Sequence, residues 1–207
     1  MVKAVDFWDA RAEGYAKSSV GDEEAYKEKL ATTQRYFDAD SQVFEFGCGT
    51  GTTAIHHAPF VQKIVATDIS SNMIEIARQK AVAADITNVL FHCTALEDFE
   101  AEDASFDVVM AHSILHLLED PEQAIKLSYR LLKPGGVFVT STACLGDSFS
   151  HWRVLLLIGK LFRQVPYVNV LKRETLSHYL SDAGFKVELE WDPKKQAAFI
   201  ILKKPAD

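Results

Sequence analysis

Hydrophobic and polar positions alternate along the middle of this chain with a regular rhythm. Short apolar runs are separated by longer segments whose apolar residues recur at helical spacing. The short runs predict strands at residues 43–46, 63–67, 89–92, 106–111 and 137–142. The longer segments predict helices that start at residue 52, cover residues 71–84 and run from about residue 121 to 132. Strands that alternate with helices in this way predict a parallel sheet with helices on both faces.

The two ends of the chain follow other patterns. Two N-terminal helices are predicted, over residues 6–16 and roughly 22–38, with the flexible stretch 17–21 between them. Asp22 can cap the second helix. The C-terminal part predicts two helices and two strands, at residues 151–165, 174–183, 187–191 and 197–202. The short connection between these last strands favours an antiparallel pair that closes the edge of the sheet. The fold class is therefore α/β.

Composition narrows the class of protein. A chain of 207 residues fits one domain, and its net charge of −7 argues against a general nucleic-acid binder, which normally carries a basic field. The cysteines Cys48, Cys93 and Cys144 are widely spaced and predict neither a disulfide framework nor a zinc site. The N-terminus lacks an apolar signal segment, and no apolar run is long enough to span a bilayer. We therefore expect a cytoplasmic protein without a transmembrane segment.

A carboxylate at the end of the first apolar strand carries the first chemical information. Glu45 ends this strand and is followed by a glycine-rich turn with Gly47, Gly49 and Gly51. A charge in such a place is costly unless a ligand needs it, and glycines let backbone N–H groups approach that ligand closely. Asp68 at the end of the second strand lies about twenty positions further on, as in a dinucleotide fold. The glycine spacing does not fit that fold, because the third glycine of G-x-G-x-x-G is replaced by Thr52.

These motifs resemble those of the class I S-adenosylmethionine-dependent methyltransferases, over roughly residues 35–145. The resemblance is carried by residues 45–51, 68–77, 106–109 and 131–136, which occur in the order typical of that family. It implies a Rossmann-like three-layer sandwich with a seven-stranded, mostly parallel sheet and an antiparallel last strand. The implied cofactor is S-adenosyl-L-methionine, with S-adenosyl-L-homocysteine as its product. No metal is implied.

The resemblance also divides the single domain, residues 1–207, into parts. Residues 1–38 are expected to be an N-terminal helical lid and 39–145 the cofactor-binding core. Residues 146–173 are expected to be a helical cap insertion, followed by a C-terminal helix and strand pair at 174–207. The stretch 151–173 is basic and apolar, so a cap over a pocket, a dimer contact and a membrane-surface segment stay open for it.

The same resemblance assigns roles to single residues. Glu45 would hold the cationic amino-acid end of the cofactor, Asp68 would accept its ribose hydroxyls, and Ile69 would face the adenine. The other expected contacts come from the glycine turn, the next helix, the ends of two strands and the N-terminal helix: Gly47, Cys48, Gly49, Gly51, Met73, Thr94, Ala95, Ala111 and Tyr15. Thr94 departs from the family pattern, because many relatives have an acidic residue there that reaches the adenine amine.

The acceptor is expected beyond the fourth strand. His112 and His116 follow this strand and are the catalytic candidates, although for His116 packing beside its leucine neighbours is favoured over a role as base or in orienting the substrate. A zinc site there lacks a third ligand. Methyl transfer often needs no base, because alignment of donor and acceptor supplies much of the rate.

Together these features predict methyl transfer from S-adenosylmethionine to an O, N or C atom of a small molecule, by a monomer or homodimer. The N-methyltransferase tetrapeptide Asn/Asp-Pro-Pro-aromatic is absent, and no nucleic-acid partner is expected. The alternatives are a non-catalytic module that binds S-adenosylmethionine, an RNA or protein methyltransferase and, less favoured by the glycine spacing, an NAD-dependent dehydrogenase.

Overall fold

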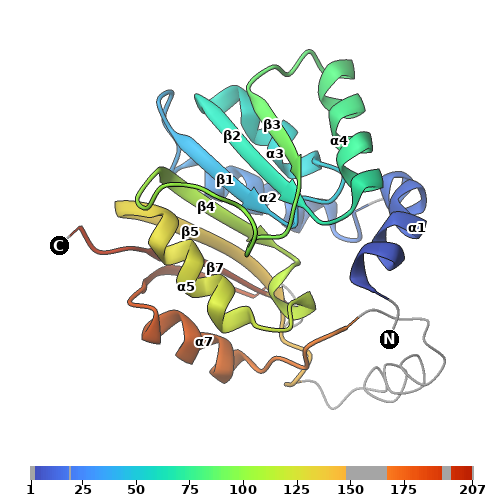
Figure 1. Ribbon diagram of the computed structural model, residues 1–207. Helices are drawn as coiled ribbons and strands as arrows, with labels where there is room; N and C mark the ends of the chain where they lie inside the picture. Colours follow the sequence, from blue (N-terminus) through green and yellow to red (C-terminus); the bar gives the residue numbers. More distant parts are fainter. Residues whose placement is uncertain (1–2, 19, 148–166, 193–196, 207) are drawn as a thin grey trace.

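A seven-stranded sheet forms the centre of the molecule (Figure 1). The structure is a computed structural model that describes residues 3–18, 20–147, 167–192 and 197–206. The strands lie in the order β3-β2-β1-β4-β5-β7-β6. Their bounds are β1 Gln42–Phe46, β2 Lys63–Asp68, β3 Val89–Cys93, β4 Phe106–His112, β5 Leu132–Ala143, β6 Lys186–Trp191 and β7 Ala197–Lys203.

The sheet is parallel except at one strand. Each pairing among β3, β2, β1, β4 and β5 is parallel, whereas β7 runs antiparallel to both β5 and β6. The fold class predicted from the sequence, a mostly parallel sheet with an antiparallel last strand, is therefore confirmed. Because the strand order reverses next to β1, the carboxyl ends of β1 and β4 face the crevice in which open α/β sheets bind ligands.

Helices cover both faces of the sheet and give three layers (Figure 1). Helices α5 (Pro121–Leu131) and α7 (Arg173–Asp182) pack on one face, and α3 (Thr52–His57) and α4 (Ser71–Ala83) pack on the other. The strands supply each core by alternation: in β4, Val109 and Ala111 face the first helices, and Val108 and Met110 face the second. Short 3₁₀ turns, η1 (Ala58–Phe60) and η2 (Leu115–Leu117), follow α3 and β4.

Two further helices precede the sheet. Helix α1 (Ala4–Lys17) packs beside α4, and α2 (Glu23–Gln34) begins where Asp22 accepts a hydrogen bond from the backbone N–H of Ala25, at 3.1 Å. The cap predicted at Asp22 is confirmed. The predicted extension of this helix to residue 38 is wrong, because the hydrogen bonds after Gln34 are those of tight turns.

Residues 133–136, which precede the strand predicted at 137–142, lie inside a strand. Strand β5 already pairs with β4 at Leu132, so the predicted start of this strand at residue 137 is wrong. The register then shifts between Phe106 and Val108, because residues 133–136 form a large bulge in which Gly135 adopts a φ of 80°.

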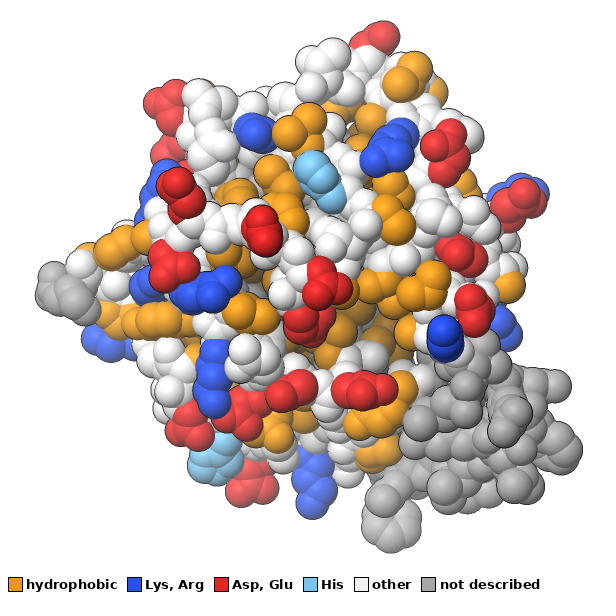
Figure 2. All heavy atoms as spheres, in the orientation of Figure 1, with side chains coloured by type: hydrophobic (Ala, Val, Ile, Leu, Met, Phe, Trp, Pro, Cys, Tyr) orange, Lys and Arg blue, Asp and Glu red, His pale blue; other side chains and the backbone are white. Residues whose placement is uncertain are grey.

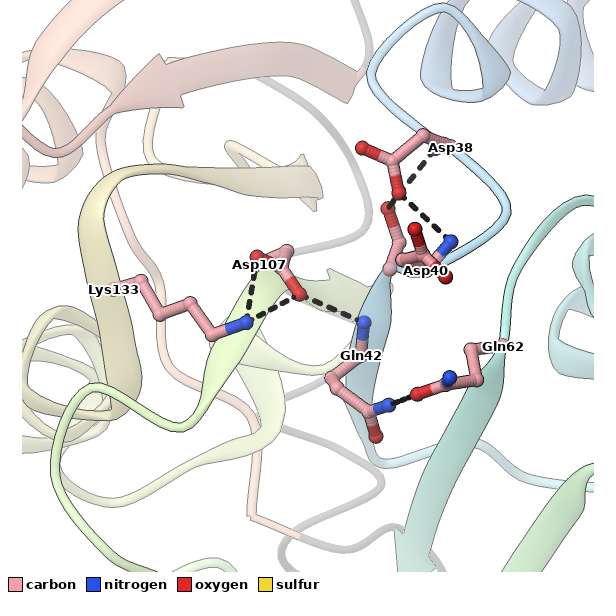
Figure 3. A network of polar contacts seen from close by, with 7 residues as sticks. Asp38, Asp40, Gln42, Gln62, Asp107 and Lys133 are labelled. Atoms are coloured by element: carbon pink, nitrogen blue, oxygen red, sulfur yellow. Dashed lines mark hydrogen bonds and ion pairs between the residues drawn. The ribbon is translucent and has the colours of Figure 1, made fainter.

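A polar network holds this bulge at the amino ends of the strands (Figure 3). The Lys133 ammonium donates to both carboxylate oxygens of Asp107, at 2.8 Å each. The same carboxylate accepts from the backbone N–H of Gln42 at 2.8 Å, which ties β1, β4 and β5 together. Two of the motifs that carried the family resemblance, at residues 106–109 and 131–136, thus have a structural reason that is independent of any ligand.

The helix expected at 151–165 lies outside the described residues. Among the helices that are described, none is both long and apolar enough to cross a membrane.

Candidate functional site

Two adjoining cavities lie where the carboxyl ends of β1, β2 and β4 meet the N-terminal helices. Their volumes are about 800 Å³ and about 130 Å³. The residues that line both are Tyr15, Gly47, Gly49, His112 and Ser113. The two cavities therefore adjoin one another at the carboxyl ends of β1 and β4.

Asp68, the last residue of β2, faces the smaller cavity. Its carboxylate accepts hydrogen bonds from the backbone N–H groups of Gly49 and Ser70, at 2.9 Å each. Burial raises the pKa of Asp68, and these two backbone donors oppose the rise. The two bonds fix the carboxylate in place, and each oxygen keeps a lone pair for a further donor.

The remaining wall of the smaller cavity is mostly apolar. Ile69 and Met73 line it together with Thr94 and Ala95, which follow β3. The Thr94 hydroxyl donates to the carbonyl of Ala95 at 3.3 Å. The cavity thus combines an apolar slot with one fixed carboxylate.

Glu45 is the most unusual charge of the site. It is 2% exposed, and its Oε2 atom has no hydrogen-bond partner. Burial, with a contribution from the negative charge of Asp68, raises the pKa of Glu45 to about 8. A buried carboxyl group with an unpartnered oxygen at the edge of the larger cavity is suited to receive a cationic donor.

The three glycines of the turn are needed for different reasons. All three have positive φ, between 53° and 72°. A Cβ at Gly47 would lie 2.5 Å from Ile114, and one at Gly51 would lie 2.8 Å from Ala77 and Phe91. A Cβ at Gly49 would meet only the ring of Tyr15, at 3.6 Å. Gly49 therefore opens the backbone toward the cavities, whereas Gly51 permits close helix–sheet packing.

Helix α2 forms the outer wall of the larger cavity. Tyr26, Lys29 and Thr33 lie on the side of α2 that lines it. The Lys29 ammonium donates to the hydroxyl of Ser141 in β5 at 2.8 Å, and the Tyr26 hydroxyl lies 3.2 Å from Thr53 Oγ1.

Three histidines near the site are held neutral. Burial lowers the pKa of His112 and of His116 to about 4 and that of His57 to about 3. His112 lines both cavities and its Nε2 has no hydrogen-bond partner, while His57, fully buried, lines the larger one. His116 lines neither cavity.

The structure brings most of the predicted cofactor residues together. Ten of them line one or both cavities: Tyr15, Glu45, Gly47, Cys48, Gly49, Asp68, Ile69, Met73, Thr94 and Ala95. Gly51 and Ala111 line neither; Ala111 is fully buried in the core, one residue before His112. Burial raises the pKa of the Cys48 thiol well above its usual value, so this sulfur stays protonated at neutral pH.

Sequence reasoning missed Lys29, Tyr26 and Ser141. The first two lie on a helix far from every motif, with nothing in their spacing to mark them. Ser141 had a signal, because the run 140–142 places polar residues at the end of an apolar strand, as Glu45 does. Within the described parts of the chain, no cluster of side chains could hold a metal ion.

Comparison with known proteins identifies the family of the domain that contains this site. Residues 44–140 match the family model described as a methyltransferase domain. The core of this chain is a methyltransferase domain. The class I methyltransferase resemblance predicted from the sequence is thereby confirmed.

Three curated relatives illustrate the range of proteins that share this domain. The chain is 31% identical over 101 residues to the uncharacterized methyltransferase YcgJ of Bacillus subtilis, covering 49% of this chain and 40% of that protein. It is 28% identical over 159 residues to a ubiquinone biosynthesis O-methyltransferase of Xanthomonas axonopodis, covering 72% and 64%. It is 32% identical over 98 residues to the tRNA 5-carboxymethoxyuridine methyltransferase of Escherichia coli, covering 46% and 38%. The chain thus spans about half the length of the curated relatives it matches.

The crystal structure of YcgJ shares the fold of the methyltransferase domain. It matches with a TM-score of 0.70 at 16% identity, covering 87% of this chain and 99% of that one. At this identity the likeness establishes the fold and leaves the reaction to be argued from the site.

Proposed function

We propose that this protein transfers a methyl group from S-adenosylmethionine to a small-molecule acceptor. One observation carries the proposal: Asp68 and Glu45 end neighbouring strands of a methyltransferase domain, with the open backbone of Gly49 between them. The apolar slot beside Asp68 fits the adenosine end of this cofactor. The buried, unpartnered carboxyl group of Glu45 fits its amino-acid end.

The chain's own residues would hold the cofactor as follows. Asp68 would accept hydrogen bonds from the ribose hydroxyls, Ile69 and Met73 would flank the adenine, and Glu45 would pair with the ammonium group. Tyr15, half-exposed on α1 above both cavities, would cover the site and exclude water. The bound cofactor supplies an activated methyl group on its sulfonium. The same set does not favour a dinucleotide, because Thr52 occupies the position of the third glycine in G-x-G-x-x-G.

The larger cavity supports a small acceptor. Its volume of about 800 Å³ lies within the range of ordinary ligand pockets, and it adjoins the smaller cavity through Gly47, Gly49 and His112. His112 is neutral at physiological pH, so it could accept a proton from an acceptor hydroxyl or amine. The main contribution of the site is alignment of the acceptor with the methyl group.

Calorimetry with S-adenosylhomocysteine tests the proposal directly. We expect binding by the wild-type protein and at least about tenfold weaker binding by Asp68→Ala, because a charge-assisted pair of hydrogen bonds is lost. Asp98→Ala is a matched control, since Asp98 is an exposed acid of the loop after β3 and lines neither cavity. Absence of binding at millimolar ligand, or equal binding by Asp68→Ala, would contradict the proposal.

A tRNA acceptor is the second candidate, and the similarity to the tRNA methyltransferase of Escherichia coli favours it. The acidic net charge of −7 speaks against it. On the face shown in Figure 2, Lys and Arg side chains are dispersed among Asp and Glu and form no continuous basic patch. Incorporation of labelled methyl groups into bulk tRNA, but not into a metabolite extract, would decide for tRNA. The cytoplasmic location and the monomeric or homodimeric state stay predictions.

A further inference from the structure

A lysine of the N-terminal part reaches across the larger cavity to the sheet. Lys29 on α2 donates a hydrogen bond to Ser141 near the carboxyl end of β5, at 2.8 Å. Both residues line the larger cavity, and neither lines the smaller one that contains Asp68. An ammonium group has three N–H donors, so Ser141 leaves donors of Lys29 available to a ligand.

Within the part of the chain that the structure describes, this ammonium has no carboxylate at ion-pair distance. Asp22 and Asp192 act on it only as more distant charges, and burial lowers its pKa. Its hydrogen bond and its ring contact are with uncharged groups: it donates to the hydroxyl of Ser141 and lies 5.8 Å from the ring of Phe199 in a cation–π contact. A half-buried cation beside a cavity is suited to bind an anion.

The place of Lys29 along the sheet separates it from the cofactor residues. The strand order β2-β1-β4-β5 sets Asp68, Glu45, His112 and Ser141 side by side in that sequence along one edge. Neighbouring strands lie about 4.8 Å apart, so Ser141 lies roughly 10 Å beyond Glu45 and 14 Å beyond Asp68. His112, the residue between, belongs to both cavities. Lys29 and Ser141 therefore lie on the acceptor side.

We propose that Lys29 and Ser141 form a subsite for an anionic group, of which a carboxylate is the simplest, on the methyl acceptor. The subsite rests on the proposed function, since it assigns a substrate class to the same site. Lys29 binds the anion as a charge-assisted donor, and the Ser141 hydroxyl donates a second hydrogen bond while it accepts one from Lys29. The anion anchors the acceptor at β5, so that its reactive atom lies near His112, between the two cavities.

Matched anionic and neutral probes test the subsite. We expect protein saturated with S-adenosylhomocysteine to bind benzoate about tenfold more tightly than benzamide in an NMR titration, because only benzoate forms charge-assisted bonds with Lys29. Lys29→Met should abolish this preference and Lys29→Arg should retain it. Lys27→Met is the control, because Lys27 is an exposed residue of the same helix that lines neither cavity.

A second set of titrations shows whether Lys29 binds an anionic group of the acceptor or the carboxylate of the cofactor. The affinity for S-adenosylhomocysteine should be equal in wild type and Lys29→Met, which also shows that the variant is folded. If Lys29→Met weakens S-adenosylhomocysteine but not 5′-methylthioadenosine, which lacks the amino-acid end, the lysine binds the cofactor carboxylate and the inference is overturned. Equal affinities of the wild type for benzoate and benzamide overturn it too. Failure of the wild type to bind S-adenosylhomocysteine is a distinct result, because it contradicts the proposed function itself.

Discussion

The carboxylate of Asp9 on α1 accepts a hydrogen bond from the hydroxyl of Ser70 at 2.6 Å. It also accepts from the backbone N–H of Asn72, at 3.1 Å, at the start of α4. The backbone N–H of Ser70 in turn donates to Asp68. The N-terminal helix that carries Tyr15 is thus fastened to the residue that helps to fix the predicted ribose-binding carboxylate.

Releasing this fastening should weaken cofactor binding. In Asp9→Ala we expect about threefold to tenfold weaker binding of S-adenosylhomocysteine, because α1 no longer holds Tyr15 over the cavities. Limited proteolysis should cut the stretch between α1 and α2 sooner than in wild type. Asp6→Ala serves as control, since Asp6 is exposed on the same helix. Unchanged affinity together with unchanged proteolysis would show that α1 docks without Asp9.

Protonation of Glu45 should couple binding to pH. The pKa of about 8 means that this carboxyl group is mostly protonated at pH 7 in the free protein. A cationic amino group beside it would favour the carboxylate, so binding of S-adenosylhomocysteine should release a proton. Calorimetry at pH 7 in two buffers of different ionisation enthalpy measures this release. Glu45→Gln should bind without it, and proton release that persists in Glu45→Gln would assign it to another group.

The same group should make the free protein less stable as pH rises. The pKa of Glu45 is raised from 4.5 to about 8 in the folded state, so the folded state binds more protons than the unfolded state between these values. Stability is therefore lost as pH rises toward 8. Between pH 6.5 and 8 we expect a loss of about 2 kcal/mol in wild type relative to Glu45→Gln, measured by denaturant unfolding. The buried histidines are neutral in the folded state but titrate near pH 6.5 in the unfolded state, so they oppose this loss equally in both proteins, and the comparison with Glu45→Gln isolates the carboxyl group. Parallel profiles of the two proteins would contradict the assignment.

Two glycine substitutions should differ in their effects: Gly51→Ala should mainly lower stability, and Gly49→Ala should mainly weaken ligand binding. Both Gly49→Ala and Gly51→Ala force a left-handed backbone on alanine, which costs about 1–2 kcal/mol. Gly51→Ala adds a clash with Ala77 and Phe91, so its total loss of unfolding free energy should be about 3 kcal/mol. Gly49→Ala should lose little more than the strain, yet weaken S-adenosylhomocysteine because its methyl group enters the space beside Tyr15. Equal stabilities of the two variants would show that α4 and β3 yield to the added methyl group.

Substitutions of the two candidate histidines should affect different measurements, methyl transfer for His112 and protein stability for His116. His112→Ala should lower methyl incorporation from labelled cofactor into a metabolite extract about tenfold or more, because His112 faces both cavities. His116→Ala should change incorporation little and instead lower the free energy of unfolding by about 1 kcal/mol, since this side chain lines neither cavity. The reverse result would make His116 the functional residue. Neither pKa, about 4, predicts an inflection of the rate between pH 6 and 8.

The sequence was informative where chemistry and periodicity coincide. Glu45 and Asp68 could be found because a charge at the end of a buried strand conflicts with its apolar pattern, and each conflict marked a cavity residue. The alternation of strands and helices likewise predicted the sheet, because each element must bury one face.

Other features depend on contacts between distant residues. Nothing local in the sequence indicates that Lys29 contacts Ser141, 112 positions away, or that a Cβ added at Gly51 would clash with Phe91. The bulge at Lys133–Gly136 reads as a turn locally, and only the ion pair with Asp107 and the pairing of Leu132 make it part of a strand. Helix ends were missed for the same reason, as at Gln34, where no strong stop signal stands in the sequence.

The order of the strands has a consequence for how acceptor specificity can evolve in such a protein. The groups that would grip the methyl donor end β1 and β2, whereas Lys29 and Ser141 come from α2 and β5, on the other side of β4. We therefore expect a substitution at position 29 or 141 to alter the preference for the acceptor and to leave the affinity for the methyl donor unchanged. With this strand order, acceptor specificity could change by single substitutions while the donor-binding residues stay the same.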